Sequence, residues 1–390
     1  MGLGTASRSP LDSYNPTMAR AFDVCIRGAG ITGRALALLL ARERLRVGLV
    51  CDPESPRLPH PTDVRAYALN HASRSILESL RCWPDPHQAT AVLEMQVAGD
   101  AGGELRFNAH AQGVEALTWI VDVPALEVRL TEALSYQPQI EILNAPEVAT
   151  LTVVCEGRAS ASRRAYGVEF DVTAYPQHAL AARLRTSVPH GQVARQWFTE
   201  QGVLGCLPLG GPQGEELAIV WSVSPELAQQ LRLAGAEDFA TQLQAASHGA
   251  YGTLHLSSER MVWPLQLARA QRWTGRNEDG AWALAGDAAH TVHPLAGQGL
   301  NLGLADVAEL ARVLRQRDYW RRVDDPLLMR RYERSRKADV LAMGASTDGL
   351  QQLFARPGEA WRKLRNWGLN GFDHSGPLKT WLAQRAINAS

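Results

Sequence analysis

The chain has 390 residues, of which 45% are hydrophobic, so it can bury a large core and is long enough for two or three packed units. Its 40 Lys and Arg residues balance 40 Asp and Glu residues, and this formal net charge of zero gives no support for a nucleic-acid partner. The five cysteines are scattered and include no CxxC pair, which argues against a disulfide framework or a zinc site and favours a reduced, cytoplasmic protein: Cys25, Cys51, Cys82, Cys155 and Cys206.

The first segment, residues 1–19, is rich in Ser, Pro, Gly and Thr and lacks the basic-then-apolar order of a signal peptide. We expect this segment to be a disordered tail. Apolar runs in the rest of the chain stay below the roughly 18–20 residues that a membrane-spanning helix needs. The sequence therefore predicts no transmembrane helix.

A strand–turn–helix–strand pattern begins at residue 22. Residues 22–26 predict a short buried strand, residues 34–42 a helix and residues 46–51 a second strand. Gly28, Gly30 and Gly33 lie between the first strand and the helix in GxGxxG spacing, which permits a tight turn and close approach of the backbone to a pyrophosphate. The N-terminus of the helix adds free N–H groups and a positive dipole end. This context favours a dinucleotide-binding βαβ unit over a coincidental glycine turn.

An acidic residue about 20 positions further on usually binds the ribose of such a dinucleotide. Here the second strand ends at Cys51, and Asp52 follows it. Asp52 either takes the ribose contact or is an ordinary turn residue before Pro53.

The central part of the chain changes character. A helical run to residue 80, strands at 91–98 and 104–107, and a helix at 123–134 precede a strand at 151–154, which ends in the turn Glu156-Gly157. Residues 167–267 then contain many short strand candidates, at 169–174, 203–207, 218–223 and 251–256, interrupted by a single helical stretch at about 224–247. This pattern indicates an antiparallel sheet layer with a different task from the first third.

A second glycine-rich turn follows the predicted strand 282–285. Gly286 and Asp287 end this strand, and a compact turn with Pro294 leads to a helix at 299–315, which an apolar stripe along one side predicts. The glycine-rich start of this helix can hold backbone N–H groups against an anion. His290 and His293 lie in the turn, where they act either as general acids or bases or, as we favour, hold the turn in shape by hydrogen bonds.

The order and spacing of these three segments resemble the para-hydroxybenzoate-hydroxylase-like flavoprotein monooxygenases. The stretch GDAAHTVHPLAGQGLNLGLAD is similar to the signature of the Ubi-type hydroxylases of ubiquinone biosynthesis, and DVRAYALN, TWIVDVPALEVRL and QWFTEQGVLGCLPL are also family-like. The resemblance runs from about residue 22 to the C-terminus. It implies an FAD-dependent enzyme in which NAD(P)H reduces the flavin and O2 forms a C4a-hydroperoxide that hydroxylates the ring of a polyprenyl phenol.

The resemblance also implies an α/β fold, in which a Rossmann-like FAD-binding domain is interleaved with an antiparallel-sheet substrate domain. We assign residues 20–90, 115–166 and 275–340 to the FAD-binding domain, 91–114 and 167–274 to the substrate domain, and 341–390 to a C-terminal helical segment. No metal is implied, and the sequence shows no clustered metal ligands.

The family's site residues carry over to matching positions here. Gly28, Gly30 and Gly33 match the pyrophosphate turn, Arg65 matches an arginine that contacts FAD and controls flavin position, and Asp287 matches a ribityl contact. Pro294 matches the peroxide side of the flavin and is the candidate catalytic residue, together with His290. The expected cofactor contacts are completed by residues of the three turns: Asp52, Glu156, Gly157, Gly286, Gly297, Gln298, Gly299, Leu300 and Asn301.

Four positions depart from the family pattern. Cys51 stands where a ribose glutamate is usual, Glu156 replaces an aspartate, Arg27 replaces a buried apolar residue and Arg34 a small one. A charge at the end of a central strand is costly unless it is paired or solvated, so Arg27 either finds a partner or meets a phosphate. The departures motivate an alternative function, a weakly or non-catalytic flavin-fold scaffold subunit of a quinone-biosynthesis complex.

Two other readings of the chemistry are disfavoured. A flavin halogenase would carry a Trp-x-Trp-x-Ile-Pro element, which is absent, and a simple NAD-dependent dehydrogenase would not need the second segment around Asp287.

Basic residues are frequent near the C-terminus. We interpret Arg330-Arg331 and residues 334–337 as solvated helix faces. Residues 351–390 contain six Lys and Arg residues against two acidic residues, with several Trp, Leu and Phe side chains. They either pack on the catalytic body or contact a membrane surface or a partner subunit, which would make a cytoplasmic protein peripheral to the inner membrane.

Overall fold

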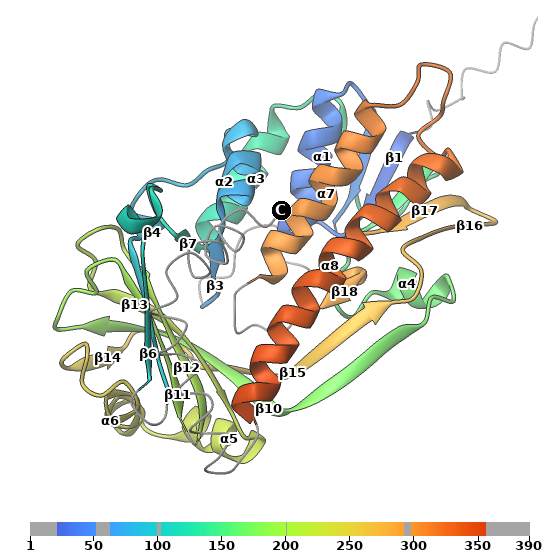
Figure 1. The fold of residues 1–390 in the computed structure, drawn as a ribbon. Helices are drawn as coiled ribbons and strands as arrows, with labels where there is room; N and C mark the ends of the chain where they lie inside the picture. Colours follow the sequence, from blue (N-terminus) through green and yellow to red (C-terminus); the bar gives the residue numbers. More distant parts are fainter. Residues whose placement is uncertain (1–21, 52–62, 100–102, 200, 292–297, 356–390) are drawn as a thin grey trace, which may run out of the picture.

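The computed structural model describes residues 22–51, 63–99, 103–199, 201–291 and 298–355. A six-stranded sheet forms one half of the molecule (Figure 1), in the order β16-β17-β9-β1-β2-β8. Its strands are parallel except β16, which pairs antiparallel with β17. The bounds are β1 Phe22–Arg27, β2 Val47–Val50, β8 Ile140–Leu143, β9 Ala149–Val154, β16 Thr274–Asn277 and β17 Gly280–Leu284.

Long helices cover one face of this sheet. Helices α1, α7 and α8 run side by side across it in Figure 1, and α1 also packs against α3. The predicted apolar stripe of α7 is buried at Leu304, Val307, Leu310, Val313 and Leu314, which stabilises the fold by roughly 1.5–3 kcal/mol per side chain. The helices are α1 Ile31–Arg42, α2 His71–Ser79, α3 Val123–Ser135, α4 Ala161–Ala165, α7 Gly299–Arg315 and α8 Pro326–Ala355.

A nine-stranded sheet forms the other half, in the order β18-β15-β10-β13-β12-β11-β5-β6, with β14 paired to β10. It is antiparallel except between β11 and β5, which run parallel. Helices α5 Pro225–Leu233 and α6 Ala236–Ala246 pack on it. The strands are β5 Glu94–Ala98, β6 Glu104–Asn108, β10 Phe170–Thr186, β11 Val193–Thr199, β12 Gly202–Leu209, β13 Glu216–Val223, β14 Leu254–Leu256, β15 Met261–Ala270 and β18 His290–Thr291.

A small three-stranded antiparallel sheet stands between the two halves. Its order is β3-β7-β4, with bounds β3 Ala66–Leu69, β4 Ala89–Val92 and β7 Thr118–Asp122. Two single-turn 3-10 helices, η1 His110–Gln112 and η2 Gly286–Ala288, complete the elements of the described chain.

The predicted fold class is confirmed, with local corrections. The predicted helix at 224–247 is two helices, because Ala234 and Gly235 break it and Gly235 begins α6. The predicted strand at 251–256 is confined to its last three residues, since residues 249–252 form turns. The predicted strand at 91–98 is divided at Leu93 between β4 and β5. The division of the chain into the two domains stays a prediction.

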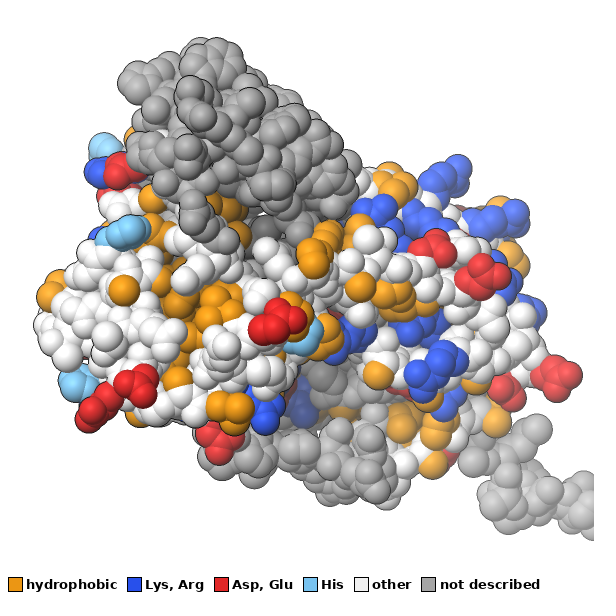
Figure 2. All heavy atoms as spheres, turned by 90° about the horizontal axis from the view of Figure 1, so that it is seen from below, with side chains coloured by type: hydrophobic (Ala, Val, Ile, Leu, Met, Phe, Trp, Pro, Cys, Tyr) orange, Lys and Arg blue, Asp and Glu red, His pale blue; other side chains and the backbone are white. Residues whose placement is uncertain are grey.

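Surface character differs between the two halves. Seen from below, Figure 2 shows apolar side chains gathered over the half that holds the nine-stranded sheet, whereas Lys and Arg side chains gather over the other half. None of the helices in the described ranges is long and apolar enough to cross a membrane.

Candidate active site

The first glycine turn has the geometry that its spacing predicts. Gly28 has a φ of 106°, and a Cβ there would lie 2.5 Å from the Cys155 carbonyl oxygen. A Cβ at Gly33 would lie 1.9 Å from the Gly28 carbonyl oxygen, so strand and helix meet too closely for a side chain. A Cβ at Gly30 would meet nothing within 4 Å. Gly28 and Gly33 are therefore needed for packing, whereas Gly30 leaves open space at the start of α1.

Two helices with uncapped N-termini pack together beside this turn. Neither α1, which follows Gly30, nor α7, which follows Gln298, has a side-chain cap or an acidic residue in its first turn. The first turn of α1 and the second turn of α7 lie side by side, because a Cβ at Gly303 would lie 3.0 Å from the Thr32 hydroxyl. The Gly286 turn adjoins both helices, since a Cβ at Gly286 would lie 3.2 Å from the Thr32 methyl group. Uncapped helix N-termini offer free N–H groups and positive dipole ends, which suit a bound anion.

Gly286 and Asp287 border the same region. Gly286 has a φ of 61°, and its N–H donates to Asp306 Oδ2 at 2.8 Å. Asp287 is accessible to solvent, yet the surrounding protein desolvates its carboxylate enough to raise its pKa. The neighbouring His290 and Arg158 oppose this rise, and Asp306 adds to it. Asp287 is thus placed to accept hydrogen bonds from a polar ligand.

A buried ionic network lies beneath this turn. Asp306 on α7 is fully buried and accepts from His290 Nε2 at 2.7 Å and from Arg336 Nε at 2.8 Å. These two partners hold the pKa of Asp306 below its ordinary value although burial alone would raise it. His290 also stacks on Trp273, with ring centroids 5.0 Å apart. The network fastens the Gly286 turn to α7 and α8.

His290 therefore has a structural task, and its partner lies on α7 rather than within the turn. Its Nδ1 atom is buried and has no hydrogen-bond partner in the described structure. The catalytic role of His290 stays a prediction.

The network also corrects the interpretation of residues 334–337 as a solvated face. Arg336 is only 2% exposed, because α8 turns it toward Asp306. Sequence reasoning quoted Asp306 within the second glycine-rich segment but gave it no role. Arg336 lies among other basic residues, so the sequence does not set it apart from a solvated face. Its partner Asp306 is about 30 residues away, so no local pattern connects the two charges.

Two of the four unusual residues are each other's partners. Arg27 Nε lies 3.4 Å from Glu156 Oε1, so the charge at the end of β1 is paired with protein rather than left for a phosphate. Glu156 also accepts from Ser160 Oγ at 2.8 Å, from Ser162 N at 2.9 Å and from Ser162 Oγ. Desolvation by itself would raise the pKa of Glu156, but the hydrogen bonds and the neighbouring Arg27 together lower it. The carboxylate is thus used to hold the start of α4.

A buried arginine joins the turn at Gly286 to the turn at Glu156-Gly157. Arg163 is 4% exposed and donates from Nη1 to the Ala288 carbonyl at 3.0 Å and from Nη2 to the Arg158 carbonyl at 2.9 Å. Its guanidinium lies 3.6 Å from the centroid of the Phe170 ring. Sequence reasoning missed Arg163, although it lies in the same short segment as Glu156 and Gly157.

Asn301 clamps the first turn of α7 to the small sheet. Its Oδ1 accepts from Asn70 N at 3.1 Å and from Ser73 Oγ at 2.7 Å, and its Nδ2 donates to the Ala68 carbonyl at 2.8 Å. Nδ2 also lies 3.3 Å from Gln298 Oε1. The side chain is therefore occupied within the protein, which leaves the backbone of the α7 start for the predicted cofactor contact.

The remaining predicted residues lie around this centre. Arg65 pairs with Asp63 at 2.6 Å and with Glu127 at 3.3 Å. The unusual Arg34 is buried and donates to the Glu127 carbonyl at 3.2 Å, which satisfies one of its donors. Gly157 and Gly299 both leave open space where a Cβ would be, and Leu300 is half-buried. Asp52, His293, Pro294 and Gly297 lie outside the described residues.

The nine-stranded sheet presents a half-buried apolar strip on one face. Along β12 and β13, alternate residues such as Leu204 and Trp221 are buried under α5 and α6. The residues between them, including Val203, Gly205 and Val220, face the other way and are only half-buried. A Cβ at Gly205 would meet only the Val220 carbonyl, at 3.7 Å.

This strip and the glycine turns share a neighbour, strand β3. The carbonyl of Ala68 on β3 accepts the hydrogen bond from Asn301 on α7, and Ala68 also packs against the buried cluster that includes Leu209 of β12 and Ala218 of β13. The α7 start and the apolar strip are therefore joined through one short strand.

These residues fit FAD. The uncapped helix starts suit its pyrophosphate, the open space at Gly30 and Gly299 allows its close approach, and Asp287 suits its ribityl hydroxyls. When bound, FAD supplies electron transfer and O2 activation. Within the described ranges, no group of three or more His, Cys, Asp or Glu side chains is placed to hold a metal ion.

Comparison with known proteins agrees with this fit. A family model described as an FAD binding domain matches residues 147–343. The chain is 28% identical to ubiquinone hydroxylase UbiL of Rhodospirillum rubrum, over 98% of this chain and 94% of that protein. It is 27% identical to the 3-demethoxyubiquinol 3-hydroxylase of Escherichia coli, over 94% and 98%.

The fold is shared with a solved structure. The p-nitrophenol 4-monooxygenase PnpA from Pseudomonas putida superposes with a TM-score of 0.73 at 16% identity, covering 95% of this chain and 98% of that one. From the family match and the site geometry together, the chain belongs to the FAD-binding family of flavoprotein monooxygenases and is an FAD-dependent monooxygenase.

Proposed function

We propose that this monooxygenase hydroxylates the aromatic ring of a polyprenyl phenol in ubiquinone biosynthesis, with NAD(P)H as the electron donor. The observation that carries the proposal is the packing together of two helices with uncapped, glycine-rich starts, near a half-buried apolar face of the nine-stranded sheet. Support comes from the relatives named ubiquinone hydroxylase and 3-demethoxyubiquinol 3-hydroxylase, which align along nearly their whole length.

The overall reaction balances without a metal. One oxygen atom of O2 replaces a ring hydrogen as a hydroxyl group, and the other leaves as water. Two electrons come from NAD(P)H as a hydride, and one proton comes from the solvent.

The described residues contribute binding, orientation and exclusion of water. The α7 start, held in place by Asn301, would present its positive dipole end to a bound flavin and so favour a negative charge there. The strip at Val203 and Val220 offers an apolar wall to the phenol and its prenyl chain, and Gly205 leaves room for a ring to lie flat.

Reduction and product analysis test the proposal together. The purified protein is first examined for the visible flavin spectrum after gel filtration. It is then reduced anaerobically with NADH or NADPH and exposed to O2 in the presence of a short-chain prenyl phenol. The expected product is the substrate plus one oxygen atom, incorporated from labelled O2.

Other outcomes separate the alternatives. FAD binding and reduction with no product from any prenyl phenol would overturn the substrate assignment and leave the monooxygenase family unchanged. Absence of FAD binding would favour the alternative function, a scaffold subunit. That alternative is motivated by Cys51, which stands where a ribose-binding glutamate is usual.

We further propose a cytoplasmic location peripheral to the inner membrane, because the prenylated substrate lives in the lipid. The expected contact, with the membrane or with other subunits of a biosynthetic complex, involves the basic and aromatic segment 341–390. Residues 356–390 lie outside the described structure. Flotation of the protein with vesicles, before and after removal of this segment, tests the assignment.

A further inference from the structure

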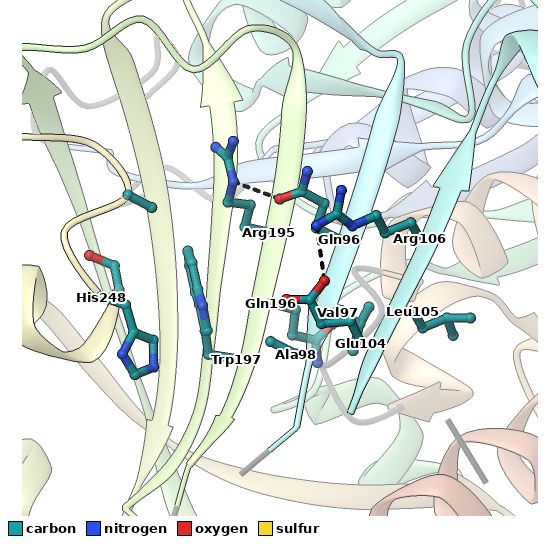
Figure 3. Close-up of a pocket in the computed structure, with 12 residues that line it drawn as sticks. Gln96, Val97, Ala98, Glu104, Leu105, Arg106, Arg195, Gln196, Trp197 and His248 are labelled. Atoms are coloured by element: carbon teal, nitrogen blue, oxygen red, sulfur yellow. Dashed lines mark hydrogen bonds and ion pairs between the residues drawn. The ribbon is translucent and has the colours of Figure 1, made fainter. Parts of the chain in front are cut away.

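A hollow lies on the face of the nine-stranded sheet opposite the apolar strip. It has a volume of about 180 Å³ and lies between β5, β6, β11 and the loop that follows α6. Trp197, which lines it, belongs to the same buried cluster as Leu231 of α5 and Phe239 of α6. Arg195 is two residues away on β11 and therefore faces the same side. Figure 3 shows both side chains, with His248 close to Trp197.

Arg195 is a fixed cation in this hollow. Its Nε donates to Gln96 Oε1 at 3.0 Å, and Gln96 Nε2 in turn donates to Glu94 Oε1 at 2.7 Å. The guanidinium also lies 5.1 Å from the centroid of the Tyr251 ring, which restrains it from a second direction. The guanidinium is thus held before any ligand arrives, which lowers the entropic cost of binding one.

No described carboxylate neutralises Arg195. None lies within the 4.0 Å that defines an ion pair, and the amide of Gln96 separates the guanidinium from Glu94. The other two charges of the hollow, Arg106 and Glu104, pair with each other at 2.9 Å. Arg195 therefore gives the hollow an excess positive charge.

Trp197 supplies a flat apolar wall. It is 8% exposed and packs edge-on against Tyr251, with ring centroids 6.2 Å apart. The loop on the other side is fixed by backbone hydrogen bonds from His248 to Ala245 and from Ala250 to Ser247. The hollow is therefore preformed, and its 180 Å³ correspond to about six water molecules.

A planar fork of donors beside an aromatic wall matches a carboxylate attached to a small flat group. A phosphate or sulfate is a poorer match, because it offers no apolar surface to Trp197 and is usually met by several donors. We propose that this hollow is a second binding site, separate from the flavin region, for a small planar organic carboxylate. Its recognition elements are Arg195 for the charge and Trp197 for the flat body.

The test uses the FAD-loaded protein and benzoate as the probe, with binding measured by isothermal titration calorimetry. Arg195→Met removes the charge and keeps the aliphatic stem. Arg185→Met is the matched control, because Arg185 is an exposed arginine of β10 that does not line the hollow. We expect benzoate to bind the wild type and the control equally and to bind Arg195→Met about tenfold or more weakly, as for the loss of a charge-assisted hydrogen bond.

Neutral and inorganic probes decide the ligand class. Benzamide has the shape of benzoate without its charge, so its weaker binding should not change in Arg195→Met but should fall in Trp197→Leu. Inorganic phosphate should not displace benzoate. Displacement by phosphate at similar concentration, or equal benzoate binding by the wild type and Arg195→Met, would overturn the proposal.

The flavin spectrum separates this site from the active site. Benzoate bound next to the flavin would shift the visible bands, and that shift should be the same in the wild type and in Arg195→Met. If Arg195→Met loses its flavin or its circular-dichroism spectrum, Arg195→Lys replaces it, because it keeps the charge without the planar fork. Benzoate affinity of Arg195→Lys equal to that of the wild type would refute the role of the fork.

Discussion

The pairing of Arg27 with Glu156 can be tested by a double-mutant cycle. The perturbations are Arg27→Met, Glu156→Gln and the two together. Arg27 Nε and Glu156 Oε1 are 3.4 Å apart, and the side chains are 29% and 20% exposed. Two unit charges at this distance attract by about 5 kcal/mol in an effective dielectric of about 20. Solvent screening and desolvation offset most of this, so we expect a net coupling of about 1 kcal/mol.

The two single variants should lower the free energy of unfolding by different amounts. Glu156→Gln should lower the free energy of unfolding by about 2–3 kcal/mol, because it weakens charge-assisted hydrogen bonds to Ser160 and Ser162 as well as the ion pair. Arg27→Met should lower it by about 1 kcal/mol. The double variant should resemble Glu156→Gln alone, since the ion pair is already lost once Glu156 is neutral and removing Arg27 then costs little more. Urea unfolding followed by circular dichroism measures all four proteins.

The pH dependence gives an independent check. The pKa of Glu156 is lowered from 4.5 in the folded protein, so its contribution to stability is present above pH 4.5 and is lost as the pH falls through the folded pKa. The stability difference between the wild type and Glu156→Gln should therefore shrink in that acidic range. A coupling of zero, combined with a large loss of FAD affinity in Arg27→Met, would refute the pairing and show that Arg27 serves a phosphate instead.

Three other outcomes are expected. Gly30→Ala should weaken FAD binding without changing the stability of the FAD-free protein, because its Cβ meets nothing within 4 Å. Gly33→Ala should lower both FAD binding and stability, because its Cβ would lie 1.9 Å from a carbonyl oxygen. Fluorescence titration with FAD and thermal unfolding distinguish the two variants, and equal effects would contradict the geometry. Asp306→Asn should lower the free energy of unfolding by about 3–5 kcal/mol, because it leaves Arg336 buried without a counter-charge. A loss under about 1 kcal/mol, the value for an exposed ion pair, would show that Arg336 does not depend on Asp306 for its counter-charge. Asn301→Ala should loosen the α7 start and raise the Kd for FAD, which Asn301→Asp should do less if the acceptor contacts matter most.

Local patterns in the sequence were sufficient to predict the main elements that surround the candidate site. The GxGxxG spacing predicted the turn after β1, and the apolar stripe predicted α7 with its observed bounds. Both signals are short in range, because a tight turn constrains neighbouring residues and a helix face repeats within a few positions. The same reasoning went wrong at 224–247, where a two-residue break between helices leaves the apolar periodicity almost unchanged.

The tertiary structure decided which charges meet. Arg27 and Glu156 looked like two separate departures from the family pattern, and only the parallel pairing of β1 with β9 brings them together. Arg336 looked solvated among basic neighbours, yet the packing of α8 turns it inward to Asp306. The sequence by itself determines periodicity and turn chemistry over a few residues, whereas ion pairs between distant segments depend on strand order and helix packing, which no local pattern encodes.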